Sequence, residues 1–344
     1  MPMAKKILLS AAAAILVMAV AVSIGSVMIP WDDMGQILLH RLTGSALPET
    51  VSGTHDTILW NVRLPRVLMA FLVGAALSAS GAVTQSLLRN PLASPYTLGV
   101  SAGAALGAGI CIITGFTISW LGSFLLPTAG LLFGLLTILG AIVFATRVDA
   151  NLSTNTIILS GMVFSLFINA MLTMLTVLNR ESMERIAMWQ LGSFSGKSYT
   201  QVLALLPFVL LGLAGFLLFS RELDLFTFGE EQAMAAGVNT RRLKWILMTL
   251  CGILTGSAVS FSGIIGFIDM IVPHIVRRLF GNSHRLMLPM TMLFGGMFLV
   301  AADLIARTIM APSELPVGVI CALTGAPFFV WVYFKRSTGG KPNA

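Results

Sequence analysis

The chain is divided into long stretches that contain no Asp, Glu, Lys or Arg, and this pattern limits its fold more than any other feature. A helix needs about 20 apolar residues to cross a hydrocarbon core about 30 Å thick. Charged residues make up only 10% of the chain and hydrophobic residues 56%, whereas a soluble domain has about 25% charged residues. The pattern excludes a disordered chain and a water-soluble enzyme, and it predicts a polytopic membrane protein. The uncharged stretches are residues 7–31, 67–88, 90–146, 150–179, 198–220, 245–268, 286–302 and 315–334.

Ten spans account best for these stretches. The run 90–146 is long enough for two spans, and Gly115, Gly122 and Pro127 cluster where it must turn. A further span is expected over 264–280, although this segment carries charged side chains. Ten spans with a cytoplasmic N-terminus leave most of the 21 Lys and Arg residues on the inside, as basic residues prefer. We therefore predict an all-α integral membrane protein with both termini in the cytoplasm.

The whole chain, 1–344, is expected to form a single transmembrane domain whose first span covers about 7–28. A cleaved signal peptide is the alternative for this first segment. The apolar region of a signal peptide has about 7–15 residues, whereas residues 7–31 separate Lys6 from Asp32. The length of the run favours an uncleaved span.

Several other classes of site are not expected. The net charge of +7 could suggest nucleic acid, but the basic residues lie between apolar runs. Residues 191–198, LGSFSGKS, resemble a phosphate-binding loop but have Leu191 where its first glycine should stand. The cysteines are isolated and the histidines lack metal-binding spacing. We expect no catalytic residue, no metal site, no cofactor and no nucleic-acid partner.

Ionisable residues inside spans are costly in lipid and usually face protein or water. Asp303 and Arg307 are four residues apart, so they share one helix face and can neutralise each other. They are either an ion pair that locks the helix or part of an external docking face. Asp269 and His274 lie on one expected helix. Each of them is either a structural polar contact or a pathway residue.

Two segments outside the spans carry patterns that suit contact with a partner. The longest internal loop, 221–244, contains GEEQAMAAGV, in which Glu230 and Glu231 can open a short helix that Gly237 ends. Such a helix can enter a groove on another protein, or the loop is merely solvated. The motif RLPR, residues 63–66, opens the second span on the outside and can bind lipid headgroups or an acidic partner.

Together these motifs resemble the permease subunits of ABC importers for iron–siderophore, haem and vitamin B12, the FecCD-type or type II importer family. The resemblance covers the core 63–335, and its strongest blocks are 63–108, 229–238, 262–289 and 302–329. It implies a bundle of ten transmembrane helices in the bacterial cytoplasmic (inner) membrane. It also implies a homodimer, or a similar heterodimer, with the pathway between the subunits. Two ABC ATPase subunits would dock inside and a substrate-binding protein outside.

The resemblance also implies roles for individual residues. The cytoplasmic coupling loop lies within 221–244, and its predicted ATPase contacts are Gly229, Glu230, Glu231, Ala233 and Gly237. The predicted contacts with the external binding protein are Arg63, Arg66 and Arg307. The chain departs from the family at Asp269, where a glycine is usual. This carboxylate either meets a partner such as Ser262, Arg277 or water, or faces the pathway.

The function that the resemblance implies is inward transport of a metal chelate, with ATP hydrolysed on a separate subunit and no chemistry on the substrate. An iron–siderophore is favoured on family frequency, and haem and cobalamin are the alternatives within the family. A secondary transporter or a channel would be a different class. The first should show inverted repeats and broken helices, and the second a ring of filter groups; the sequence shows neither pattern.

Overall fold

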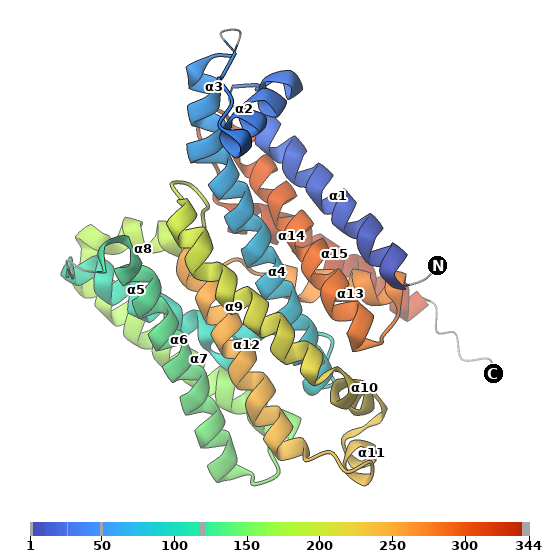
Figure 1. Cartoon of the computed structure of the whole chain (residues 1–344). Coiled ribbons are helices and arrows are strands. Elements are labelled where there is room, and N and C mark those ends of the chain that lie inside the picture. The colour runs from blue at the N-terminus through green and yellow to red at the C-terminus, as the bar shows by residue number, and fades with distance from the viewer. Residues whose placement is uncertain (1–2, 26, 49–50, 117, 119–120, 339–344) are drawn as a thin grey trace.

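The computed structural model describes residues 3–25, 27–48, 51–116, 118 and 121–338, with no strand among them. It confirms the all-helical membrane fold, and its helices pack around α4 (Figure 1). The longer helices are α1 (Met3–Ser23), α4 (Leu64–Leu87), α6 (Leu125–Val148), α7 (Thr154–Leu178), α9 (Tyr199–Leu218), α12 (Thr240–Ser262), α14 (His284–Thr308) and α15 (Val317–Thr338). The shorter ones are α2 (Trp31–Thr43), α3 (Gly53–Thr57), α5 (Val100–Thr114), α8 (Met183–Gln190), α10 (Ser220–Phe228), α11 (Glu230–Ala235) and α13 (Ile268–Phe280).

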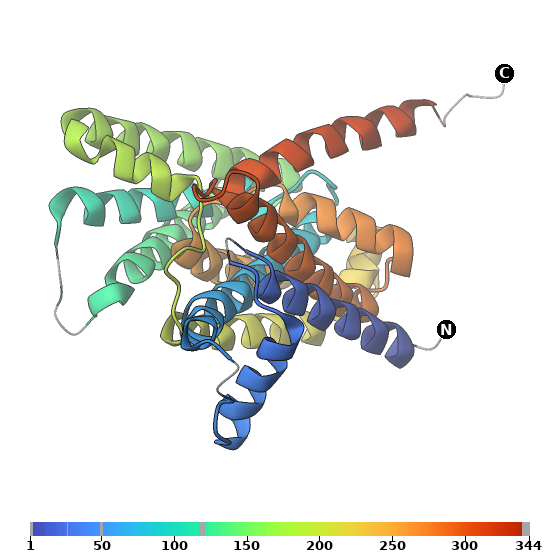
Figure 2. The ribbon, with the colours of Figure 1, turned by 90° about the horizontal axis from the view of Figure 1, so that it is seen from above.

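The bundle has two flanks that meet at α4. Helices α1, α13 and α14 pack on one side of α4, while α9 and α12 pack on the other and carry the layer of α5, α6 and α7 (Figure 1). A π-helical segment, Ile58–Arg63, extends α4 at its first end, where α2 and α3 project from the bundle (Figures 1 and 2). The cytoplasmic loop expected over 221–244 contains α10, α11 and the first turn of α12.

Burial follows the expected lipid exposure of the helices. Helix α4 is buried along nearly its whole length, whereas α7 exposes large apolar side chains on several faces. An apolar surface of this size is stable against lipid or another apolar surface but not against water. The outer helices therefore present apolar side chains that suit contact with lipid. The small residues of α4 lie at the centre of the bundle.

Small residues let α4 and α14 come into backbone contact. Gly74 of α4 faces Gly295 of α14, and a Cβ atom on either glycine would overlap the backbone carbonyl of the other. The hydroxyl of Ser78 donates a 2.9 Å hydrogen bond across the same contact to the carbonyl of Thr291. In lipid, where apolar side chains gain little by leaving the solvent, such close packing is a main source of helix association.

The expected number of spans is reached only in part. Among the described residues, seven helices are long and apolar enough to cross a membrane, and Val100–Thr114 and Val317–Val330 are shorter apolar helices. The tenth span was expected over 264–280, but α13 begins only at Ile268 because the backbone turns through positive φ at Gly263 and Phe267. With 13 residues, α13 is about 20 Å long, less than a hydrocarbon core. The total of ten stays a prediction.

Filling the α4–α14 contact should destabilise the bundle. We expect Gly74→Ala to lower the free energy of unfolding by about 1–3 kcal/mol, because the added methyl group forces the two backbones apart. Thermal unfolding of the purified protein in detergent measures this change. Gly35→Ala in α2 is the matched control, since a Cβ there meets nothing within 4 Å. An equal or higher unfolding temperature for Gly74→Ala would contradict the packing described above.

Candidate functional site

The segment after α10 is folded as a short helix, α11, that is fixed to the bundle by an ion pair with a buried lysine. Lys244 of α12 is fully buried, and its Nζ atom lies 2.5 Å from Oε1 of Glu230. The same Nζ donates a 2.8 Å hydrogen bond to the carbonyl of Leu152 in the loop between α6 and α7. One ammonium group therefore joins α11, α12 and the α6–α7 loop, and it does so with charge-assisted hydrogen bonds.

Glycines set both ends of α11. Gly229 precedes it with φ 134° and ψ 153°, a conformation essentially limited to glycine, and Gly237 follows it with φ 88°. Within the helix, Ala233 is fully buried, whereas Glu231 is exposed. The expected helix and its glycine stop are thus present. Ala233 packs inward, so Glu231 rather than Ala233 is presented to the surroundings.

The α6–α7 loop that receives Lys244 is itself fixed by Asp149. Its carboxylate accepts backbone hydrogen bonds of 2.9 Å from Asn151 and from Ser153. Hydrogen bonds from the side chain and backbone of Ser153 and from the backbone of Asn151 lower the pKa of Asp149 to about 2. The carboxylate is therefore ionised at neutral pH, and the loop keeps the carbonyl of Leu152 in place.

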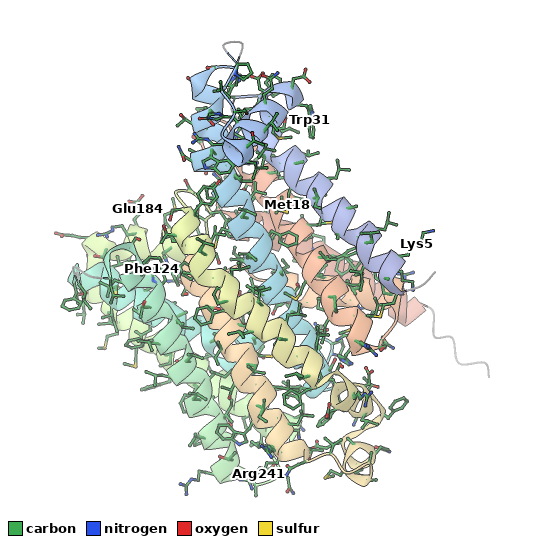
Figure 3. All side chains as sticks on the ribbon, viewed as in Figure 1. Lys5, Met18, Trp31, Phe124, Glu184 and Arg241 are labelled. Atoms are coloured by element: carbon green, nitrogen blue, oxygen red, sulfur yellow. The ribbon has the colours of Figure 1, made fainter. Side chains whose placement is uncertain are left out.

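A wide groove of about 860 Å³ opens beside α11. Glu230 and Glu231 line it together with Arg89 and Arg241, so charges of both signs face the groove. Phe228 and Met234 add exposed apolar surface. Arg241 marks this end of the molecule in Figure 3. A helix flanked by charges and exposed apolar side chains suits a protein partner better than a small ligand.

At the opposite end of α4, Arg66 is enclosed by two carboxylates. Its Nη2 atom lies 2.8 Å from Oδ1 of Asp303, and its Nε atom lies 3.0 Å from both oxygens of that group. Its Nη1 atom donates to both oxygens of Glu314 at 2.8 and 2.9 Å. Arg66 and Asp303 are buried, whereas 40% of the Glu314 side chain is exposed. This cluster links α4, the last turns of α14 and the loop that precedes α15.

The other two arginines of this end also bind their own chain. Arg63 is buried and donates hydrogen bonds to three backbone carbonyls of the segment 22–27, two of them at 2.9 and 2.7 Å. Arg307 donates to the carbonyl of Ala21 and lies 3.8 Å from the carboxylate of Asp303. The expected Asp303–Arg307 pair therefore shares one face, but Arg66 is the nearer partner of Asp303. Docking of a binding protein on these arginines stays a prediction.

Asp269, the unusual acid, is buried where α13 meets α4. Ser94, in the loop between α4 and α5, donates a hydrogen bond to its Oδ2 atom, while Oδ1 has no partner among the described residues. Ser262 and Arg277 were partners expected from the sequence, but in the described structure Ser262 bonds backbone carbonyls and Arg277 bonds Gln85 instead. His274 lies on the same helix with its ring centroid 6.2 Å from that of Phe328.

Polar side chains lead from Asp269 to the end of the bundle that carries α11. The backbone carbonyl of Asp269 accepts a 3.1 Å hydrogen bond from Gln85, whose Oε1 atom accepts a 2.5 Å bond from Arg277. Further along, Ser86 lies 2.7 Å from Nε2 of His284, and Nδ1 of His284 lies 2.6 Å from Asp224 of α10. This chain of contacts joins α4, α13, α14 and α10.

Sequence reasoning missed Lys244, Glu314 and Ser94 as partners of the predicted residues. Each pairs with a residue at least 14 positions away along the chain, so helical spacing carried no signal for it. In the described part of the chain, no group of three or more His, Cys, Asp or Glu side chains could hold a metal ion.

The model of the FecCD transport family matches residues 13–335. The chain belongs to this family. It is 37% identical to the hemin transport system permease of Yersinia pestis, covering 83% of this chain and 86% of the relative. It is 38% identical to the cobalamin import system permease of Halobacterium salinarum (92% and 82% covered) and 36% identical to the Fe(3+)-citrate import system permease of Bacillus subtilis (81% and 81%).

A solved structure agrees with the fold over almost the entire chain. It is an inward-facing ABC transporter assigned to the metal-chelate type, with a TM-score of 0.82 and 30% identity, covering 96% of this chain and 99% of that one. The match confirms the expected bundle of a type II importer permease. The three relatives differ in what their names say they carry, so family membership alone does not define the substrate.

Removing the Glu230 carboxylate should loosen α11. We expect Glu230→Ala to weaken the helix by about 1.5–3 kcal/mol, the usual size of a hydrogen bond to a charged group, because Lys244 then loses its counter-ion. Hydrogen–deuterium exchange of the amides of 230–236 should become about ten- to a hundredfold faster. Glu231→Ala is the matched control and should leave exchange unchanged. Similar exchange in both variants would show that the ion pair does not hold α11.

Removing Arg66 should be far more damaging than removing its exposed partner. We expect Arg66→Ala to destabilise the protein by about 3–5 kcal/mol, because Asp303 is left buried and without its main counter-ion. Glu314→Ala removes a partly exposed partner and should change stability by about 1 kcal/mol or less. Unfolding temperatures in detergent compare the two variants with the unmodified protein. A milder effect for Arg66→Ala than for Glu314→Ala would contradict the assigned arrangement.

Proposed function

We propose that this chain is the permease subunit of an ATP-driven importer that carries a metal chelate inward across the cytoplasmic membrane. Membership of the FecCD family and the three permeases for hemin, cobalamin and Fe(3+)-citrate support a metal chelate as the cargo. Among chelates, an iron–siderophore complex is favoured, because one of these relatives is named for a non-haem iron chelate, Fe(3+)-citrate. Haem and cobalamin remain the alternatives within this proposal.

The proposal rests on the way in which α11 is attached to the transmembrane helix α12. A partner that pushes on a loop can drive helices only if the loop is rigidly joined to them. Lys244 supplies this joint, because its buried amine binds Glu230 of α11 while its backbone belongs to α12. Two ATPase subunits on the cytoplasmic side would bind Glu231 and the neighbouring groove. ATP would then favour one state of the permease by binding it more tightly than the other.

The complete transporter in this proposal has three further components. A second permease subunit, a homodimer in the simplest case, forms the other half of the pathway, and its opening alternates between the two sides of the membrane. An external binding protein docks at the end that carries Arg63, Arg66 and Arg307. Because these arginines already bind their own chain, acidic groups of that protein would compete with Glu314, the exposed carboxylate on Arg66.

Reconstitution with the cognate ATPase and binding protein tests the proposal. We expect vesicles to take up an iron chelate only with ATP, and to do so with every ion gradient collapsed. Glu231→Lys should reduce co-purification of the ATPase at least about tenfold, since it reverses a charge at the contact. Glu184→Lys on α8 is the matched control. Uptake driven by a gradient without ATP would instead show a secondary transporter.

A further inference from the structure

A small cavity of about 150 Å³ lies at the end of the bundle opposite α11. Its walls are the last residues of α12, the first turns of α6 and α9, the end of α8 and the loop 193–197. Phe261 of α12 packs edge-on against Phe124, 6.4 Å between ring centroids, on one side of it. Phe124 and Glu184 are labelled near this region in Figure 3. Neither helix α11 nor the residues around Arg63, Arg66 and Arg307 contribute to the lining of this cavity.

The polar groups that line the cavity are one lysine, one glutamine and five serines, and no carboxylate is among them. Lys197 forms no hydrogen bond or ion pair with the residues that the structure describes. Burial lowers the pKa of this amine from its usual value. Glu184, on α8 close by, is exposed and does not line the cavity. Lys197 is partly exposed, so water is the only partner that the described structure leaves for its amine in this cavity.

The neighbouring polar groups have hydrogen-bond donors to spare. Oε1 of Gln201 accepts a 3.3 Å bond from the backbone of Ser198, and no bond is recorded for its amide nitrogen among the described residues. Oγ of Ser193 accepts a 3.1 Å bond from the backbone of Ser195, so its proton remains to be donated. Ser195 also lines the cavity. One lysine, one glutamine and two serines with free donors thus line the same cavity, and no carboxylate lines it with them.

We propose that this cavity binds a small anionic oxygen group, a carboxylate or a phosphate, held by Lys197 and by the donors of Gln201, Ser193 and Ser195. Such a group neutralises the charge of the partly buried Lys197 amine and accepts charge-assisted hydrogen bonds from the neighbouring donors. Since a water molecule takes up about 30 Å³ of liquid, the cavity has room for a carboxylate or a phosphate but not for an entire haem or cobalamin. The site would therefore hold one anionic arm of a larger molecule.

Two sources can present this chemistry. One is a soluble polycarboxylate or oxyanion, including the carboxylate arm of an anionic metal chelate, and the other is the phosphate of an anionic lipid headgroup. Either would bring its anionic group to the amine of Lys197 and reduce the reactivity of that amine. The proposal does not depend on ATP or on uptake, so the binding test below can fail or succeed independently of the proposed transport function.

Chemical labelling of lysine measures occupancy of this cavity directly. The full chain is reconstituted in phosphatidylcholine vesicles and treated with an amine-acetylating reagent, and the modification of Lys197 is followed by mass spectrometry. Citrate, inorganic phosphate, or vesicles that include phosphatidylglycerol are then compared with plain vesicles. At ten times the dissociation constant, one-site occupancy slows labelling of Lys197 about tenfold. Lys5, an exposed lysine in the same sample, should not change.

Protection by citrate or phosphate in plain vesicles supports a site for a soluble anion, and protection by phosphatidylglycerol alone supports a headgroup site. Ser195→Asp places a carboxylate beside Lys197 and should abolish protection by any added anion. Thr200→Asp, which adds the same charge outside the lining, is the matched control and should keep it. Equal labelling of Lys197 in every arm, or equal protection of Lys5, would overturn the proposal.

Discussion

In this bundle, every strongly buried basic group that joins helices finds its partner within the chain. Water is absent from the hydrocarbon region, so an unpaired charge or an unsatisfied carbonyl there is expensive. Arg66 meets Asp303 and Glu314, and Lys244 meets Glu230 and a backbone carbonyl. These contacts lie near opposite ends of the molecule. The central part is held instead by close packing of small residues such as Gly74 and Gly295.

Ion pairs at the two ends and small-residue packing in the centre explain how one permease chain can be rigid at its ends and still allow its helices to move. The charged joints fix the segments where partner proteins are proposed to bind. Between them, the contacts of α4 with α14 rely on shape rather than on ion pairs, and packed surfaces of this kind can slide between discrete arrangements. The polar contacts from Gln85 through Arg277 to His284 and Asp224 are the exception, because they carry hydrogen bonding from the interior to α10.

Features set by local patterns were predicted well from the sequence. Long uncharged runs gave the helical membrane fold, and two acids followed by a glycine gave the short helix α11. The i,i+4 spacing placed Asp303 and Arg307 on one face. Pairs between distant segments were not predictable in this way. The helical period predicts which face of a helix a residue occupies, but not which other segment packs against that face. The pairing of Ser94 with Asp269 therefore could not be predicted from it.

The mounting of α11 also has a mechanical meaning. Helix α12 carries Lys244 near its first end and reaches the small cavity with its last residues, and its 23 residues make a rod about 34 Å long. A torque applied to α11 would rotate both ends of this rod together. Anything seated at the far end would then resist or assist that rotation, and by reciprocity the rotation would alter how tightly it is held.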